Sequence, residues 1–370
     1  MLPFADLRWV ADAIGDHIAE RTTAVIRSGR YVLGPEVDGF EQRFATYCGV
    51  AHGIGVGSGL DALVLVLRAW GIGEGDEVIV PSHTFIATWL AVEQVGARVV
   101  PVEPDPQTLT LDASQLEAAI TDRTRAIIPV HLYCQPADMG AIMPIARRHG
   151  LRVLEDASQV HGARLGSARV GSLGDAAAFS LYPTKPLGGI GDGGIITTAD
   201  AALADRLRTL RNYGSAKKYH HTIKGVNSRL DPIQAAVLDL KLDHLDGWLD
   251  ARARMADRYL RELRDLPGLV LPQLRDDCTP SWHLFVVRCD ARDALRQHLL
   301  QRGVQTMLHY PVPCHRSECY RDEAVAQMHL PIADETAATC LSLPLDMHLS
   351  EADIGLVIKA VRSFFDKETA

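Results

Sequence analysis

Short apolar runs alternate with helix-like segments through the first half of the chain. The apolar runs predict strands at 54–56, 77–80, 97–102, 126–130 and 151–154. The segments between them predict helices at 60–70, 84–95, 116–120 and 139–149. Two further helices are predicted before this alternation, at 7–29 and 36–47. Continuous apolar strands alternating with helices are typical of a largely parallel sheet covered on both faces.

The pattern changes after the alternating region. A long helix is predicted over about 231–263, and a smaller α+β unit follows it. Its predicted strands are 282–288 and 304–308, and its predicted helices are 293–302, 335–339 and 351–365. A chain of 370 residues is long for a single core. We therefore expect a large α/β domain over residues 1–245 and a small C-terminal α+β domain over residues 246–370.

Composition and charge restrict the possible functions. The net charge of −8 argues against broad nucleic-acid binding, which needs a basic face. Seven cysteines without paired spacing indicate a reduced, cytoplasmic protein. Cys314, His315 and Cys319 form a local cluster, but no second pair completes a zinc site, so no metal is predicted. No signal-peptide pattern opens the chain, and no apolar stretch approaches the ~20 residues of a membrane helix.

One lysine lies between an apolar strand and a glycine-rich loop. Lys185 follows the apolar run 176–181 and precedes the glycines of 188–194. Lysine amines attack carbonyls to form Schiff bases, so Lys185 is a candidate nucleophile. The alternatives are a solvated surface lysine and a dinucleotide-binding glycine finger. Such a finger opens a helix, whereas these glycines lead into a predicted strand at 195–198.

Other candidate residues also follow predicted strands, where open parallel sheets bind ligands. Ser58 and Gly59 precede a helix and predict a phosphate site, although Ser58 would also serve as an ordinary helix cap. Asp156 is placed to pair with a pyridinium nitrogen, or to cap the next turn. Gln159 would reach a ring hydroxyl, and Ser180 would donate to the phosphate.

Taken in order, these motifs resemble a known family nearly end to end. The matching segments are 28–37, 57–63, 81–88, 155–163, 179–194, 211–215, 225–231 and 309–311. The chain resembles the sugar aminotransferases of the DegT/DnrJ/EryC1/StrS group. That resemblance implies the fold type I of aspartate aminotransferase, with pyridoxal 5'-phosphate (PLP, or PMP in its amine form) as cofactor.

The resemblance implies a role for each matching residue. Lys185 would bind the cofactor as a Schiff base, Asp156 would hold the pyridinium, and Phe85 would stack on the ring. The residues implied to contact the cofactor are Ser58, Gly59, Leu60, Phe85, Asp156, Gln159, Ser180, Lys185 and Asn227. Leu60 stands where many members have threonine. Asn227 would reach the phosphate of a neighbouring subunit, which implies a homodimer with shared active sites.

The sequence around Lys185 is similar to that of family members that aminate carbon 3 of nucleotide-linked keto-deoxyhexoses. Members that act on carbon 4 usually have glutamate in place of Asp192, whereas Pro186 and His83 depart from the carbon-3 pattern. The implied reaction moves an amino group from L-glutamate to a 3-keto-6-deoxyhexose, with thymidine diphosphate the expected carrier. The residues expected to contact the substrate are Tyr182, Lys217, Tyr219 and His309. Lys217 or Lys218 would neutralise the diphosphate, or lie in a solvated loop.

Four other functions are compatible with parts of this pattern. A carbon-4 aminotransferase of the same family and an amino-acid aminotransferase stay open, since fold does not determine substrate. Dehydratases of this fold carry histidine at the lysine position, so Lys185 argues against them. A cofactor-binding regulator would need an added DNA-binding domain, and the resemblance begins near residue 28.

Overall fold

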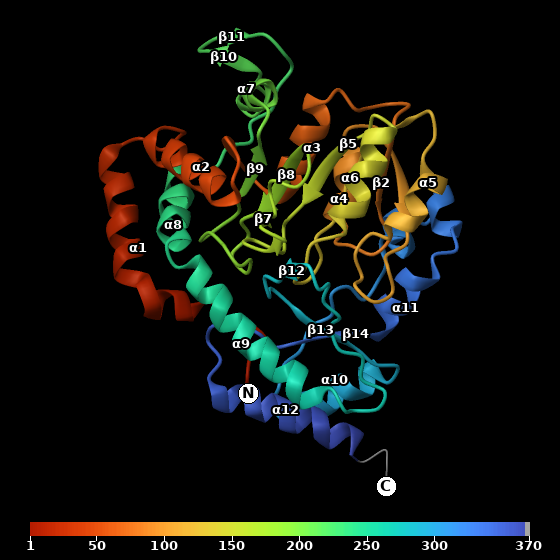
Figure 1. The fold of residues 1–370 in the computed structure, drawn as a ribbon. Helices are drawn as coiled ribbons and strands as arrows, with labels where there is room; N and C mark the ends of the chain where they lie inside the picture. Colours follow the sequence, from red (N-terminus) through yellow and green to blue (C-terminus); the bar gives the residue numbers. More distant parts are fainter. Residues whose placement is uncertain (367–370) are drawn as a thin grey trace.

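A seven-stranded sheet forms the centre of the protein in the computed structural model, which describes residues 1–366 (Figure 1). The strand order is β1-β9-β8-β5-β4-β2-β3. The strands are β1 (His52–Val56), β2 (Glu77–Pro81), β3 (Arg98–Val102), β4 (Thr124–Ile127), β5 (Arg152–Asp156), β8 (Ala176–Ser180) and β9 (Gly194–Thr198). Neighbouring strands from β8 to β3 are parallel, whereas β9 runs antiparallel to β8 and β1. The predicted mostly parallel α/β fold is confirmed.

Helices cover both faces of this sheet, so alternate residues of one strand enter different cores. Val78 and Val80 of β2 pack in one core, and Ile79 between them packs in another. One face is covered by α3 (Gly59–Ala69), α4 (Ala87–Gln94) and α7 (Ala201–Leu210). The other is covered by α2 (Pro35–Cys48), α5 (Leu116–Ala119), α6 (Met139–Arg148) and α8 (Pro232–Leu242). Burial on both faces explains the continuous apolar runs, since each fully buried large side chain stabilises the fold by roughly 1.5–3 kcal/mol.

The C-terminal part has its own core, to which Phe285 and Leu341 belong. Its elements are α9 (Leu245–Leu263), β13 (Phe285–Arg288), α10 (Arg292–Gln301), α11 (Pro331–Thr339), β14 (Cys340–Leu343) and α12 (Glu351–Phe365). Strands β13 and β14 pair antiparallel. The N-terminus lies against this part, where Leu2 pairs with Val304 (Figure 1). We keep the domain division between residues 245 and 246, at the start of α9, as a proposal.

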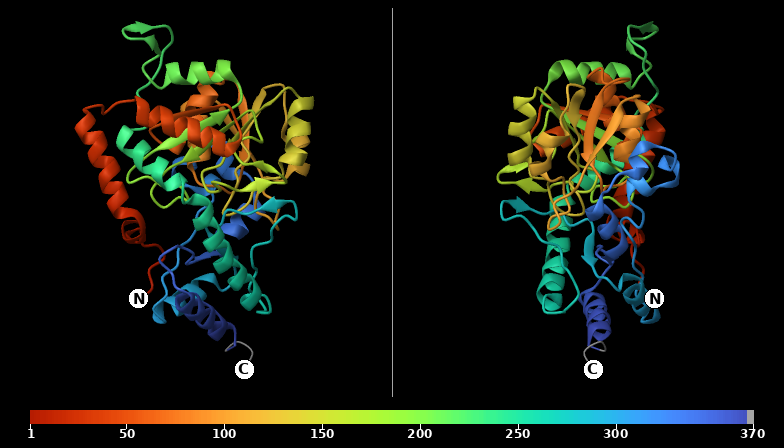
Figure 2. Two further views of the ribbon diagram at one scale, coloured as in Figure 1. Left: turned by 60° about the vertical axis from the view of Figure 1, so that its left-hand side comes forward. Right: turned by 90° about the vertical axis from the view of Figure 1, so that its right-hand side faces the viewer.

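The remaining elements are short or peripheral. They are α1 (Arg8–Ser28), β6 (Arg164–Leu165), β7 (Ala168–Arg169), β10 (Ser215–Lys217), β11 (His220–His221), β12 (Cys278–Thr279) and the 3-10 turns η1 (Ala113–Gln115), η2 (Cys314–Arg316), η3 (Glu318–Tyr320) and η4 (Ala324–Gln327). The β10–β11 hairpin projects from the body of the protein in both views of Figure 2. Within residues 1–366, no helix is long and apolar enough to cross a membrane. The same residues contain no group of three or more acidic, histidine or cysteine side chains placed to hold a metal ion.

Three predicted elements were wrong in detail. The helix expected over 231–263 is two helices: α8 packs against the sheet, and α9 begins in the same core at Leu245 and continues into the C-terminal core at Ala256. The helix expected at 84–95 begins only at Ala87, and the residues before it line a cavity in a non-helical segment. The strand expected at 304–308 is absent as a ladder: Val304 and Met307 each form one isolated bridge, with different segments.

Candidate active site

A cavity of about 640 Å³ lies between the carboxyl ends of β5 and β8 and the C-terminal part. Asp156 ends β5 and pairs in register with Ala178 of β8, so Ser180 lies at the same edge of the sheet. Parallel sheets bind ligands at this edge. The predicted site residues that line the cavity are Ser58, Gly59, Leu60, Phe85, Asp156, Gln159, Ser180, Tyr182, Lys185 and His309. Segments far apart in the sequence thus meet in one place.

Lys185 lies in a tight turn after β8. Its backbone N–H donates to the carbonyl of Tyr182 at 2.9 Å. A Cβ at Gly188 would lie 2.3 Å from the carbonyl oxygen of Pro183, so only glycine permits this close return of the chain. Burial lowers the pKa of Lys185 to about 8, against the opposing attraction of Asp156. The amine therefore loses its proton far more readily than an exposed lysine, as a nucleophile requires.

The Asp156 carboxylate is buried and held by two donors. The Thr88 hydroxyl donates to Oδ2 at 2.8 Å, and the backbone N–H of Ser158 donates to Oδ1 at 3.2 Å. The Thr88 hydroxyl also lies 3.0 Å from that of Thr84. Sequence analysis missed Thr88 as a site residue. It lies within the matched segment 81–88, but nothing in that segment marks it as a partner of Asp156.

Gln159 belongs to a hydrogen-bond network that joins the sheet to the C-terminal part. Its amide nitrogen donates to the Tyr310 hydroxyl at 3.0 Å, and its amide oxygen accepts from the backbone N–H of Tyr133 at 2.9 Å. The Tyr133 hydroxyl donates to the carbonyl of His309, whose Nδ1 lies 2.7 Å from the Ser342 hydroxyl. The contact expected between Gln159 and a ring oxygen stays a prediction, because both ends of its amide already have protein partners.

The start of α3 has the features of a phosphate site. The Ser58 hydroxyl accepts from the backbone N–H of Asp61 at 3.1 Å, so its predicted role as a helix cap is confirmed. The N–H groups of Gly59 and Leu60 follow in the first turn, where no intrahelical acceptor exists. A Cβ on Gly59 would lie 2.8 Å from the Cβ of Ser180, so glycine allows this helix to approach β8. The arrangement suits an anion, and the phosphate contacts stay predictions.

Three predicted residues lie outside the cavity of their own chain. Lys217 is on the β10–β11 hairpin and Tyr219 lies at its turn, 82% exposed. Asn227 is exposed and forms a backbone bridge with Asn212. The expected substrate contacts of Lys217 and Tyr219 stay predictions, because their hairpin extends away from the body of its own chain (Figure 2). Asn227 was expected to serve a neighbouring subunit, which its position outside the cavity permits.

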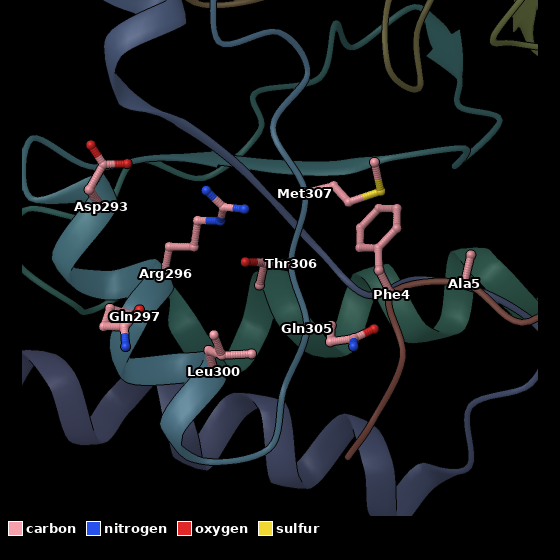
Figure 3. A pocket seen from close by; sticks show the side chains of 9 residues that line it. All are labelled: Phe4, Ala5, Asp293, Arg296, Gln297, Leu300, Gln305, Thr306 and Met307. Carbon is pink, nitrogen blue, oxygen red and sulfur yellow. The ribbon is translucent and has the colours of Figure 1, made fainter.

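A second cavity of about 760 Å³ lies beside α10, and Phe4, Ala5 and Met307 line both cavities. Figure 3 shows the Phe4 ring next to the Met307 side chain, with Arg296 reaching in from the helix. This cavity is of similar size, but neither a lysine nor a strand end lines it. The chemistry therefore belongs to the cavity around Lys185.

The C-terminal part contributes polar side chains that sequence analysis missed. Arg252, His283 and Asp346 line the active-site cavity. Arg252 comes from α9, His283 from the segment before β13, and Asp346 from the loop after β14. No motif or strand-end position marks any of them. A buried arginine on a helix is visible only once the cavity is known.

The cavity has residues suited to the ring nitrogen, the phosphate and the carbonyl carbon of the predicted cofactor. Asp156 offers a fixed carboxylate for the pyridinium, and the start of α3 offers N–H groups for the phosphate. Lys185 supplies an amine of lowered pKa between them. The Phe85 ring is 51% exposed, with its centroid 5.4 Å from that of Tyr310, and so presents a face to the cavity. The residues present are those that pyridoxal phosphate needs.

Comparisons with known proteins agree with this arrangement. The family model described as the DegT/DnrJ/EryC1/StrS aminotransferase family matches residues 12–362. A dTDP-3-amino-3,4,6-trideoxy-alpha-D-glucose transaminase from Streptomyces venezuelae is 52% identical over 366 residues, covering 99% of this chain and 97% of the relative. The crystal structure of S. venezuelae DesV in complex with a ketimine intermediate has a TM-score of 0.97 at 52% identity, covering 99% and 98% of the two chains. NtdA from Bacillus subtilis with bound PMP has a TM-score of 0.92 at 31% identity, covering 99% of this chain and 85% of NtdA.

Proposed function

Because the chain belongs to the DegT/DnrJ/EryC1/StrS aminotransferase family, we propose that it aminates carbon 3 of a nucleotide-linked keto-6-deoxyhexose, with L-glutamate as amino donor. The enzyme serves deoxyaminosugar biosynthesis, and the carrier is thymidine diphosphate. The observation that carries this proposal is the 52% identity, over 99% of the chain, to a transaminase whose name specifies a dTDP-3-amino sugar. The segment from Tyr182 to Lys185, followed by Asp192, supports the same position of attack.

Pyridoxal phosphate is the cofactor, and when bound it supplies an electron sink for the carbon that loses a proton. The residues of this chain would hold the cofactor and keep its ring nitrogen protonated. Lys185 Nζ would bind its carbonyl carbon, and Asp156 would keep its ring nitrogen protonated. Gly59 and Ser180 would hold its phosphate.

Lys185 is also the general base of the proposed reaction. With L-glutamate bound, the free Nζ would remove the proton from the donor Cα and hold it for return; water would then release 2-oxoglutarate and leave the amino group on the cofactor. With the keto-sugar, the same Nζ would deliver a proton to carbon 3, and the amino group would pass to the sugar. A pKa near 8 suits both roles, since the amine must lose and regain its proton near neutral pH.

We further propose that the enzyme is a homodimer with shared active sites. Lys217, Tyr219 and Asn227 lie outside their own cavity, and a second subunit would bring them to the opposite one. Large apolar side chains are exposed on the same chain, including Ile26, Tyr31 and Val32. We place the enzyme in the cytoplasm, supported by its seven cysteines, none of which is in a disulfide.

The test is an absorbance spectrum of the PLP-loaded enzyme before and after L-glutamate, and again after a nucleotide-linked 3-keto-6-deoxyhexose. Loss of the lysine-linked cofactor band with L-glutamate, followed by its return with the keto-sugar, is expected. A band that does not respond to L-glutamate would reject the donor. A band that is lost and does not return would reject the acceptor.

A further inference from the structure

A buried lysine outside the active-site cavity holds the loop that follows Lys185. The side chain of Lys241 comes from α8, and its Nζ donates to the carbonyl oxygen of Gly188 at 2.6 Å. Burial lowers its pKa to about 8, and no carboxylate among residues 1–366 opposes that effect. Burying an ammonium without a carboxylate partner lowers stability, so an apolar side chain would suit this position better. The contact with the loop is therefore what gives this lysine a role.

A second side chain of α8 contacts the same loop. Gln234 lies about two turns before Lys241, so both are on one face of the helix. Its amide oxygen accepts from the backbone N–H of Ile190 at 2.8 Å. A Cβ on Gly189 would lie 2.6 Å from that oxygen, and a Cβ on Gly191 would lie 2.7 Å from the amide nitrogen. Glycine at both positions thus lets the loop reach the Gln234 amide.

The loop held by α8 also forms part of the wall of the active-site cavity. The residues of segment 182–193 that line the cavity are Tyr182, Thr184, Lys185, Asp192 and Gly193. Backbone hydrogen bonds close this segment on itself. The N–H of Gly189 donates to the carbonyl of Leu181, and the N–H of Leu181 donates to the carbonyl of Gly193, both at 2.8 Å. A displacement of residues 188–190 would therefore reach the residues that line the cavity.

We propose that Lys241 and Gln234 are positioning residues, which hold the loop at residues 188–190 and thereby keep the Lys185 amine where it attacks the cofactor and moves protons. This role rests on the proposed function, in which Lys185 performs both tasks. Neither side chain lines the cavity, so both act through the backbone of the loop. Small displacements matter, because a shift of about 1 Å in a catalytic group can lower a rate about 100-fold.

The pKa of Lys185 reports on its position. Burial lowers this pKa, and the attraction of Asp156 opposes that effect. Three histidines are close enough to be affected by the charge of Lys185, and burial keeps each of them neutral by lowering its pKa: His161 to about 3, His309 to about 4, and His283 well below the ordinary value. A loosened loop would admit water to the amine, so the pKa of Lys185 would rise toward the ordinary 10.5.

The experiment compares variants of the full chain that remove or keep each contact. Lys241→Met and Gln234→Met remove the donor and the acceptor, whereas Lys241→Arg and Gln234→Glu keep them. Arg292→Met is the matched control. Arg292 is also a buried cation that donates to backbone carbonyls, those of Ala337 and Cys340, and it does not line the cavity.

Three quantities are measured for every variant. The apoenzyme gives the amide hydrogen exchange of residues 186–193 and the pH midpoint of covalent PLP capture. The PLP-loaded enzyme gives the single-turnover rate with L-glutamate at several concentrations, which separates the limiting rate from the half-saturating concentration. The first two quantities need no substrate, so they do not depend on the identity of the donor or the keto-sugar.

Lys241→Met should change all three. Exchange in residues 186–193 should increase, the capture midpoint should rise by about 0.5 pH units or more, and the limiting rate should fall about tenfold. The half-saturating concentration of L-glutamate should stay within about twofold, because the contact positions the amine and does not bind the donor. Gln234→Met should show the same changes at smaller size, since its contact is more exposed. Lys241→Arg and Gln234→Glu should recover most of each loss, and Arg292→Met should leave the loop exchange and the midpoint unchanged.

Loop exchange and a capture midpoint equal to wild type in Lys241→Met and Gln234→Met would overturn this role alone. The same changes in Arg292→Met would also overturn it, because they would follow from a general loss of stability. If Lys241→Met does not fold, the two Gln234 variants decide by the same measurements. A wild-type enzyme that captures PLP on a different lysine would instead overturn the proposed function, and the role of α8 with it.

Discussion

The two walls of the active-site cavity differ in how they are built. The wall from the large sheet consists of strand ends and a helix start, where Asp156, Ser180 and Ser58 follow directly from buried strands. The wall from the C-terminal part consists of side chains from one helix and two loops, including Arg252 and His309. In the proposed reaction the first wall would hold the cofactor and the second would face the substrates. On that proposal the sheet positions the catalytic groups, and the segments packed against it select the substrate.

Among changes to the first wall, the removal of Lys185 should have the largest effect on activity. Lys185→Ala should abolish covalent cofactor binding and turnover while leaving the fold intact, because no other lysine lines the cavity among the described residues. Borohydride reduction of the wild type, followed by peptide mapping, should place the cofactor on Lys185. Lys241 is the control: burial also lowers its pKa to about 8, but it donates to the Gly188 carbonyl outside the cavity. Lys241→Arg should retain the covalent cofactor, and label on Lys241 would contradict the assignment.

Neutralising the carboxylate of the first wall should have the next largest effect. Asp156→Asn should bind the cofactor and lower turnover by at least about 100-fold, because the ring nitrogen loses its ionic partner. Single-turnover absorbance with L-glutamate measures the loss, and dialysis against free PLP measures retention. Turnover equal to wild type would refute the role of Asp156.

The support behind that carboxylate should matter less, and it offers a matched pair of variants. Thr88→Val keeps the shape and removes the donor to Asp156, so turnover should fall about tenfold, as for a lost hydrogen bond to a charged group. Thr88→Ser keeps the donor and should recover most of the loss. The pH titration of the lysine-linked cofactor band should shift in Thr88→Val alone. Identical titrations for the two variants would show that Thr88 only packs.

The lowered pKa of Lys185 predicts how the apoenzyme captures its cofactor. Only the unprotonated amine attacks, so the rate should rise with pH and level off above a midpoint at about 8. An exposed lysine would give a midpoint near the ordinary lysine pKa of 10.5. Stopped-flow absorbance of apoenzyme mixed with PLP across this range measures the midpoint. A midpoint close to the exposed value would show that burial does not tune this amine.

Two helix caps give the smallest effects and compare the walls directly. Ser58 caps α3 in the cavity, and Ser350 caps α12 in the C-terminal part. Replacing either by alanine should cost about 1 kcal/mol of stability, measured by urea denaturation of the apoenzyme. Only Ser58→Ala should also weaken PLP binding, because only Ser58 lines the cavity. Equal PLP affinity in both variants would remove Ser58 from the phosphate site.

The difference between the two walls of the cavity also explains which parts of the site could be predicted from the sequence. Buried strands appear as continuous apolar runs, and residues at their ends, such as Asp156 and Ser180, are marked by position alone. The sheet with helices on both faces, and the cavity wall formed by its strand ends, could therefore be predicted. Thr88, Arg252 and His283 could not be found this way, because each acts on a partner brought close only by folding.

Local patterns also misplaced some elements. The apolar periodicity continues through 231–263, but the helix is interrupted between α8 and α9, and α9 extends from the core of α8 into the C-terminal core. The hairpin with Lys217 and Tyr219 was expected at the substrate site, yet a single chain holds it away from its own cavity. Periodicity indicates which face of an element is buried. It does not indicate which core or which subunit that face packs against.

The most direct test of the proposed transamination traces the amino nitrogen of L-glutamate into the product. The enzyme is incubated with ¹⁵N-labelled L-glutamate and a dTDP-linked 3-keto-6-deoxyhexose, and the product is examined by NMR. The account predicts ¹⁵N bonded to carbon 3 of the hexose and the release of one equivalent of 2-oxoglutarate. A sugar that carries no ¹⁵N, or one labelled only at carbon 4 when a 4-keto substrate is offered instead, would contradict it.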